Sequence, residues 1–272
     1  MTTKKISILW LIIRNGIEKY LVKNFKIFVP SSAGNYRILG YHTLIGIKKI
    51  FPLLSELIYL KTRRPKTLSA ITFSKRFKNK DNIKKIKKLF NKYRSDKSKI
   101  HNYHLIYGSL FKETNNIKKV FEIGLGTNNE NLISNMSSDG KPGASARAFR
   151  DFYGKSQIYG ADIDEEILFQ ENRIKTFHLD QTNLKSLNKV FKKIGGNIDL
   201  IIDDGLHASY ANVTVIIAGL KYLKNKGYLI IEDISPVTKP IWEVIDNIIK
   251  TNYRTYFIKT KSSYVYIIQK SL

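Results

Sequence analysis

The chain has 272 residues and a hydrophobic fraction of 43%, which is ordinary for a folded protein and excludes a protein that is disordered as a whole. It contains no cysteine, which excludes disulfide bonds and thiolate metal sites. Its formal net charge of +25 lies mainly at one end, because residues 1–100 hold 25 lysines and arginines against four acidic residues. A surface that attracts an anionic partner and a coding bias toward lysine explain this charge equally well.

The first 95 residues are expected to form a basic, mostly helical N-terminal segment. Their apolar run from Ile8 to Ile13 is far shorter than the roughly 20 residues that span a bilayer, and no small-residue cleavage site follows it. Apolar residues recur at helical spacing from Ile6 to Leu21, which predicts a helix that packs on the protein itself or lies on a membrane. The drop in basic charge after this segment suggests a domain boundary, with a second domain at 96–272.

From Lys118 onward, short apolar runs alternate with amphipathic segments. Strands are expected at 119–124, 157–163, 174–179, 198–204, 227–233, 253–258 and 264–269. Helices are expected at 144–152, 183–193, 209–224 and 239–251. This order predicts an α/β fold with a doubly wound, mainly parallel, seven-stranded Rossmann-like sheet that ends in an antiparallel hairpin. Such a hairpin is typical of class I methyltransferases, whereas dinucleotide dehydrogenases more often keep the sheet parallel.

The first two strands of this sheet end in residues that suit a nucleotide. Glu122, Gly124 and Gly126 stand where the first strand turns into its loop, and glycines allow a ligand to approach the backbone. Asp162, at the end of the second strand, is placed to accept hydrogen bonds from ribose hydroxyls. The alternative is that this carboxylate caps a short helix, a role that suits Asp164 better.

The loop after Gly126 is long, and it places Asp162 36 residues downstream instead of the about 20 of the simple dinucleotide fingerprint. A loop of this length tends to be functional, so we expect it to cover a cofactor or a substrate. Asp180 and Gln181, which end the third strand, are expected near the base of a nucleotide. Alternatively, Asp180 or Asn183 caps the next helix.

Paired acids end the fourth and fifth strands: Asp203 with Asp204, and Glu232 with Asp233. Carboxyl ends of neighbouring parallel strands meet at one edge, so these carboxylates should converge, and a site made only of oxygen ligands suits Mg²⁺. His207 follows closely and would accept a proton from a hydroxyl whose pKa the metal lowers. The alternative is a simple turn in which His207 starts the next helix.

Seven pieces of the chain, in this order and spacing, resemble S-adenosylmethionine- and magnesium-dependent sugar O-methyltransferases related to the mycinamicin and macrocin enzymes. The pieces are SDKSKIHNYHLIYGSLF (95–111), VFEIGLGT (120–127), GKPGASARAFRDF (140–152), IYGADID (158–164), RIKTFHLDQTN (173–183), IDLIIDDGLHA (198–208) and GYLIIEDI (227–234). The resemblance covers about 95–272. It implies that the chain methylates a sugar hydroxyl of a glycan, a cell-surface polysaccharide precursor or a glycosylated metabolite.

The resemblance also implies roles for single residues. The cofactor S-adenosylmethionine would contact Glu122, Gly124, Gly126, Asp162, Asp180 and Gln181. Mg²⁺ would be held by Asp204, Glu232 and Asp233, and the catalytic base would be His207. The active site or its lid would include His101, Tyr103 and His104, although histidines on an amphipathic helix also serve as packing or surface residues.

Two alternative functions remain at this point. A nucleic-acid methyltransferase would use the basic N-terminus as its electrostatic footprint, but the acidic cluster would repel phosphates. A catalytically silent, membrane-associated scaffold of the same fold is opposed by the intact set of acids. We expect a sugar or glycan acceptor, an anionic membrane or carrier bound through 1–95, homo-oligomer formation and no nucleic-acid partner. We expect a cytoplasmic protein at the inner face of the membrane.

Overall fold

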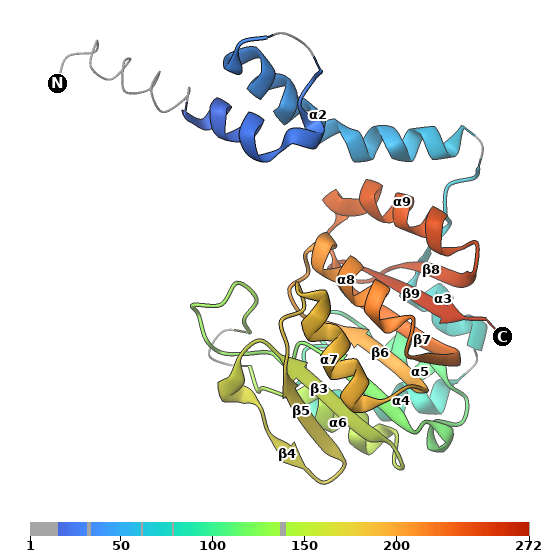
Figure 1. Ribbon diagram of the computed structural model, residues 1–272. Helices are drawn as coiled ribbons and strands as arrows, with labels where there is room; N and C mark the ends of the chain where they lie inside the picture. Colours follow the sequence, from blue (N-terminus) through green and yellow to red (C-terminus); the bar gives the residue numbers. More distant parts are fainter. Residues whose placement is uncertain (1–15, 32–33, 61, 78, 137–139, 272) are drawn as a thin grey trace. The chain divides into compact units, whose positions relative to one another are not determined.

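The computed structural model describes residues 16–31, 34–60, 62–77, 79–136 and 140–271 (Figure 1). The chain divides into two compact units, 1–63 and 64–272. Most of the helix expected from Ile6 lies outside the described residues, although residues 16–24 are helical.

The N-terminal unit consists of this short helix, the 3₁₀ turn η1 (Lys26–Phe28) and the long helix α2 (Tyr36–Tyr59). Asn35 begins α2 as its N-cap, because its side-chain oxygen accepts a hydrogen bond from the Ile38 N–H at 3.1 Å. A Cβ on Gly40 would lie only 2.9 Å from the Glu18 Cα. A glycine at this position therefore allows the two helices to pack with their backbones close together.

The larger unit alternates helices and strands. In chain order its elements are β1 (Thr67–Ser69), α3 (Ala70–Phe77), α4 (Lys80–Lys92), α5 (His104–Leu110), η2 (Thr114–Asn116), β2 (Lys119–Ile123), α6 (Ala144–Phe152), β3 (Gln157–Asp162), η3 (Glu165–Ile167), β4 (Gln170–Glu171), β5 (Ile174–His178), α7 (Leu184–Ile194), β6 (Ile198–Asp203), α8 (Ser209–Gly219), β7 (Leu223–Ile234), η4 (Pro236–Thr238), α9 (Lys239–Ile249), β8 (Tyr253–Lys259) and β9 (Tyr264–Lys270). The predicted alternation of strands and helices after Lys118 is confirmed.

Within the described residues, nine strands form one sheet in the order β1-β8-β9-β7-β6-β2-β3-β5-β4. The central strands are parallel, and β9 runs antiparallel between β7 and β8, as the predicted hairpin requires. The sheet has nine strands instead of the expected seven because β1 adds to β8 and β4 adds to β5. These two strands are three and two residues long, too short for an apolar pattern, and their pairing depends on backbone hydrogen bonds at the sheet edges.

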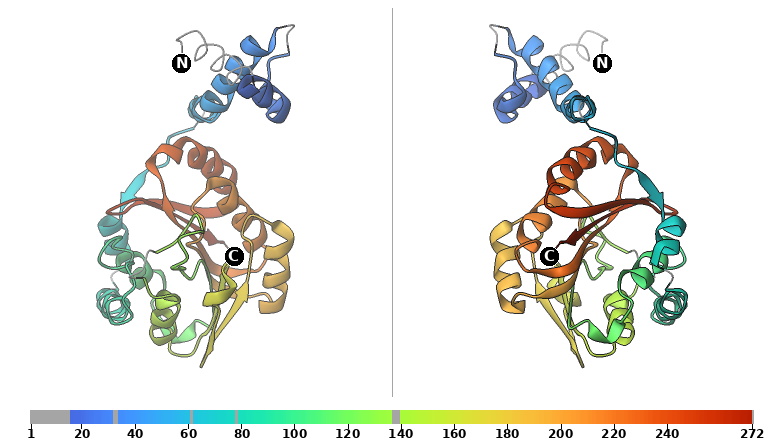
Figure 2. Two further views of the ribbon diagram at one scale, coloured as in Figure 1. Left: turned by 90° about the vertical axis from the view of Figure 1, so that its left-hand side faces the viewer. Right: turned by 90° about the vertical axis from the view of Figure 1, so that its right-hand side faces the viewer.

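Helices cover both faces of the sheet, as the turned views in Figure 2 show. Helices α3 to α6 pack on one face, with Phe73, Phe90 and Phe149 in the core, and helices α7 to α9 pack on the other. Successive strand side chains point to opposite faces, so Val120 joins the first core and Phe121 the second. A sheet buried on both faces explains why its central strands read as continuous apolar runs.

The compact unit begins at Arg64, well before the expected boundary near residue 95. Residues 64–95 supply β1, α3 and α4, and their aromatic rings reach the core: Phe73 meets Tyr256 at 5.3 Å between ring centroids. The basic charge in this stretch therefore belongs in part to solvent-facing sides of helices in the larger unit. A high net charge indicates that many side chains of a segment face solvent, and it does not mark where one domain ends.

A close crossing of α4 and α5 provides a test of the packing. A Cβ on Gly108 would lie 2.5 Å from the Ile83 Cα, so Gly108→Ala should force the helices apart and lower the free energy of unfolding by about 1–3 kcal/mol. Urea unfolding measures this loss. The control is Gly196→Ala, where a Cβ meets no described atom within 4 Å. Equal stability of the two variants would contradict the crossing.

Candidate active site

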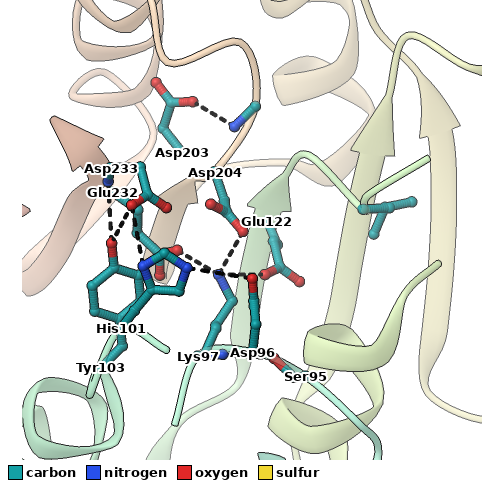
Figure 3. A network of polar contacts seen from close by, with 12 residues as sticks. Ser95, Asp96, Lys97, His101, Tyr103, Glu122, Asp203, Asp204, Glu232 and Asp233 are labelled. Atoms are coloured by element: carbon teal, nitrogen blue, oxygen red, sulfur yellow. Dashed lines mark hydrogen bonds and ion pairs between the residues drawn. The ribbon is translucent and has the colours of Figure 1, made fainter. Parts of the chain in front are cut away.

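Acidic residues meet at the carboxyl ends of three neighbouring strands (Figure 3). Glu122 lies one residue before the end of β2, Asp204 follows β6, and Glu232 lies near the end of β7, with Asp233 beside it. Glu122 and Glu232 are fully buried, whereas the side chain of Asp204 is 24% exposed. The sequence-predicted convergence of the two acidic strand ends is therefore present, and Glu122 joins them from the adjacent strand.

Lys97 lies at the centre of these carboxylates. Its ammonium Nζ is 2.6 Å from Asp204 Oδ2, 2.5 Å from Glu232 Oε2 and 3.6 Å from Glu122 Oε1, although the side chain is only 2% exposed. Burial alone would lower the pKa of Lys97, but these three carboxylates hold it well above its ordinary value. Sequence reasoning missed this residue, since nothing in the pattern separates it from the other lysines of the basic segment.

Residues of the segment 101–107 bind the same carboxylates from the other side. The Tyr107 hydroxyl donates to Glu232 Oε1, and the Tyr103 hydroxyl donates to Asp233 Oδ1 at 2.9 Å. His101 Nδ1 lies 3.3 Å from Asp233 Oδ1, and its ring stacks on Tyr103. Of the three residues expected near the active site here, His101 and Tyr103 therefore reach the carboxylate cluster.

The two histidines of this segment have different surroundings. Burial works against the charged form of His101, but a hydrogen bond to Asp96 and the charge of Asp233 raise its pKa overall. His104, at the start of α5, is buried, and burial lowers its pKa to about 4. Its Nδ1 has no hydrogen-bond partner within the described residues. His104 is thus buried at the start of α5 and does not line either of the two cavities described below.

Three side chains present ligand atoms to a common point. One atom each of Asp204, His207 and Asp233 lies within 4.8 Å of the others. His207 and Asp233 both have positive φ angles, 56° and 51°, which are uncommon for residues other than glycine. Such strain tends to persist at functional sites, where the surrounding structure holds it in place.

A cavity of about 330 Å³ opens beside the end of β2. The predicted cofactor residues that line it are Gly124, Gly126, Asp162, Asp180 and Gln181. Glu122 lies buried next to this lining. Gly124 has φ +91°, and a Cβ there would overlap the backbone carbonyl of Asp204. A glycine is therefore required where the loop after β2 passes the acidic strand end.

Asp162 holds the backbone of the loop that follows β2. Its Oδ2 accepts the Leu125 N–H at 2.7 Å, and its Oδ1 accepts the Asp164 N–H at 3.0 Å. Asp164 itself caps η3 by accepting the Glu166 N–H, which is the role that suited it in the sequence. Asp162 therefore shapes the cavity and also borders it.

The adjacent Asp203 fixes the loop between β6 and α8. It is completely buried and accepts hydrogen bonds from Gln181 Nε2 at 2.8 Å and Asn212 Nδ2 at 2.9 Å. The other end of Gln181 accepts the Leu206 N–H. Asp203 thus holds the turn that carries Asp204 and does not reach the common point.

A second cavity, of about 520 Å³, adjoins the first and shares Gly124, Gly126, Ser134 and Asp204 with it. Its lining also includes Lys97, His101, His207 and Asp233. The long loop after Gly126 borders both cavities, and Ser134 Oγ in this loop donates to the Gly205 carbonyl at 2.8 Å. The expectation that this loop covers a ligand site agrees with its position.

No family model matches the chain. Among curated proteins, it is 29% identical over 150 residues to the 8-demethyl-8-alpha-L-rhamnosyl tetracenomycin-C 2'-O-methyltransferase of Streptomyces olivaceus, covering 55% of this chain and 37% of that protein. It is 33% identical over 91 residues to the mycinamicin VI 2''-O-methyltransferase of Micromonospora griseorubida, covering 34% and 23%. It is 30% identical over 129 residues to the demethylmacrocin O-methyltransferase of Streptomyces fradiae, covering 47% and 30%. The matches thus span less than two fifths of these relatives.

Solved structures of the MycE methyltransferase from the mycinamycin biosynthetic pathway share the fold. The form in complex with Mg and SAH has a TM-score of 0.56 at 22% identity, and it covers 68% of this chain and 54% of that one. A complex that also holds mycinamycin VI gives the same values. The class I methyltransferase fold is confirmed, and the resemblance to sugar O-methyltransferases holds in sequence over as much as 55% of the chain.

The raised pKa of Glu122 predicts a pH dependence of stability that can be measured. Its Oε1 lies 3.6 Å from Lys97 Nζ, and burial raises the pKa of Glu122 from 4.5 to about 7 although the charge of Lys97 works in the opposite direction. A raised pKa favours the protonated folded state, so wild-type stability should fall as the pH rises through that range. Glu122→Gln mimics the protonated acid and removes this loss. We expect it to equal wild type near pH 5 and to exceed it by about 1–3 kcal/mol at pH 8 in urea unfolding.

The exposed Glu113 provides the control for this comparison. Glu113→Gln should follow the wild-type pH profile. A Glu122→Gln variant that gains no stability relative to wild type between these two pH values would contradict the assignment of a buried, partly protonated acid.

Proposed function

We propose that the chain is an S-adenosylmethionine-dependent, magnesium-assisted O-methyltransferase that acts on a sugar hydroxyl. The acceptor would be a glycan, a cell-surface polysaccharide precursor or a glycosylated metabolite. The observation that carries this proposal is that two cavities meet at Asp204. One is lined by the predicted cofactor residues, and the other by Asp233, His101 and His207. The names of the curated relatives support a glycosylated acceptor.

The first cavity fits S-adenosylmethionine, which supplies an electrophilic methyl group. Gly124 and Gly126 leave room at the loop where side chains would collide with their surroundings. Asp162 would offer its carboxylate to a ribose, and Asp180 and Gln181 line the same cavity. Glu122, buried next to this loop, would influence the bound S-adenosylmethionine through its negative charge or through its proton.

The donors at the neighbouring edge suit a hard cation. Asp204 and Asp233 would hold Mg²⁺, which lowers the pKa of a hydroxyl that it binds. Glu232, the third ligand that the resemblance implies, binds Lys97 and Tyr107 and lies outside the three side chains whose ligand atoms converge. The chain contains no cysteine, and every carboxylate of this cluster lies at the end of a strand. Preformed donors at fixed strand ends provide a site that needs little rearrangement.

His207 would accept the proton of the acceptor hydroxyl. Its ring is exposed and lies beside Asp204 and Asp233 at the second cavity, so an acceptor there reaches the imidazole and the cofactor cavity together. S-adenosylmethionine held in the first cavity would supply the methyl group for the acceptor oxygen, and His207 would keep the proton. Holding both reactants in line is worth up to about 7–11 kcal/mol in favourable cases.

The alternative functions receive less support. The curated relatives are named as O-methyltransferases, and none of the three names reported above mentions a nucleic acid. A silent scaffold would have no need for strained backbone at His207 and Asp233. Homo-oligomer formation stays a prediction.

Contact with an anionic membrane is the second part of the proposal. Helix α2 buries Gly40, Thr43 and Ser55, whereas its Ile38, Tyr41, Leu53 and Leu57 are 54–61% exposed. Small residues between helices and large apolar residues outside are typical of helices that face lipid. None of the described helices is long and apolar enough to cross a bilayer. We therefore place this unit at the membrane surface.

The charge of the N-terminal unit favours the same partner. Residues 1–63 contain 11 lysines and arginines and two glutamates. Basic residues near an anionic leaflet each contribute on the order of 1 kcal/mol, and exposed leucines add apolar burial at the headgroup boundary. Attachment there would bring the enzyme to lipid-linked acceptors on the cytoplasmic side.

Removal of the imidazole tests the proposed base. His207→Ala should lower methyl transfer by about 10²–10⁴-fold and leave cofactor binding near wild type, because only proton transfer is lost. Transfer is measured with magnesium against a panel of nucleotide sugars and glycans, and cofactor binding by calorimetry. The control is His178→Ala, an exposed histidine on β5. Substantial residual turnover in His207→Ala would contradict the base assignment.

Vesicle sedimentation tests the membrane contact. The full chain should bind vesicles that contain phosphatidylglycerol, and binding should weaken with salt and on pure phosphatidylcholine. Leu53→Glu combined with Leu57→Glu should remove binding, because both leucines are exposed on α2. Ile248→Glu, at an exposed position of α9, is the matched control. Wild-type protein that stays in the supernatant would contradict this part.

A further inference from the structure

Lys97 is the buried cation of a cluster that contains four carboxylates. Its ammonium contacts the acidic ends of three neighbouring strands through Glu122, Asp204 and Glu232. Within the described residues, no ion pair joins it to Asp233. The cluster therefore has an inner side, where Glu122 and Glu232 face Lys97, and an outer side, where Asp233 lies beside His207.

The backbone fixes the position of this lysine. Lys97 lies in the turn between α4 and α5, where the Ser95 N–H donates to the Phe90 carbonyl at 2.8 Å and the Tyr103 N–H donates to the Lys97 carbonyl at 2.7 Å. Its ammonium also lies 5.9 Å from the centre of the Tyr103 ring. The charge thus enters the site from the helical layer and is held there by the fold.

We propose that Lys97 is the resident counter-ion of this site, a positioning residue that holds Asp204 and Glu232 together in the metal-free protein. A divalent cation then adds its charge on the outer side, beside Asp204, His207 and Asp233. Asp204 belongs to both sides, because Lys97 binds its Oδ2 and its side chain reaches the second cavity. Stability and metal binding are therefore coupled through Asp204.

The physical reason is the cost of buried, uncompensated charge. Glu122 and Glu232 are at most 1% exposed, and their carboxylates repel each other and Asp204. Removing one partner of a buried ion pair leaves the other without compensation, which destabilises a protein strongly. A divalent cation at the outer side supplies positive charge to the same cluster. It should therefore replace part of what Lys97 provides, and its effect on stability should be larger when Lys97 is absent.

Thermal unfolding of the full chain in EDTA and in excess Mg²⁺ tests this coupling. Lys97→Met keeps the length of the side chain and removes its charge, and we expect its melting temperature in EDTA to fall by roughly 10 °C. Mg²⁺ should raise the melting temperature of this variant by at least twice the shift seen in wild type. The control is Lys99→Met, which removes the same charge from an exposed position in the same turn and should behave as wild type.

The inference rests on the proposed function, since it takes the outer side as a divalent-cation site, and the outcomes separate the two. Suppose that Mg²⁺ raises the melting temperature of wild type and raises that of Lys97→Met by no more. This result would overturn the role of Lys97 and leave the magnesium site standing. No response in either protein would overturn both the magnesium site and the inference, while cofactor binding in calorimetry tests the remaining proposal independently.

A second variant covers the case in which Lys97→Met does not fold. Tyr107→Phe removes the hydroxyl that donates to Glu232 and keeps the ring in the core. It weakens the hold on the same carboxylate, so it should also respond more strongly to Mg²⁺ than wild type does. A wild-type response from a folded Tyr107→Phe protein would overturn the proposal.

Discussion

The site depends on compensation of buried negative charge, because several carboxylates lie at the ends of adjacent strands. Lys97 enters the cluster and lies within 3.6 Å of three carboxylates from three neighbouring strands. Tyr107 and Tyr103 donate hydroxyls to Glu232 and Asp233. The outer carboxylates can then face a cavity while the inner ones remain buried.

This constraint joins the helical layer to the sheet. Helices α4 and α5 pack closely enough to require glycine at position 108, and the turn between them carries Lys97. On the opposite side, Asp203 and Gln181 hold the turn that carries Asp204, and Asp162 holds the loop that carries Gly124 and Gly126. Residues expected to touch ligands thus also shape the loops that form the two cavities.

Much of the fold followed from periodicity, because central strands buried on both faces must be apolar throughout. The helix at 144–152 begins and ends where the structure has it, whereas the helix expected to reach residue 224 ends at Gly219 because Leu223 already pairs with Ile198 in the sheet. The edge strands β1 and β4 escaped prediction, since backbone pairing alone defines them. The site was predicted where acids interrupt an apolar strand, but Lys97 resembled any other basic residue.

The sequence by itself determined the order of strands and helices, the glycines of the cofactor loop and the acids at the strand ends. Each of these is a local pattern that a chain carries before it folds. Only the tertiary structure decided which charges compensate one another. Lys97 contacts Glu232, which lies 135 residues further along the sequence, and His101 contacts Asp233 at a similar separation in sequence. Such pairs depend on how the helical layer lies against the sheet, and this is set by packing of the whole unit.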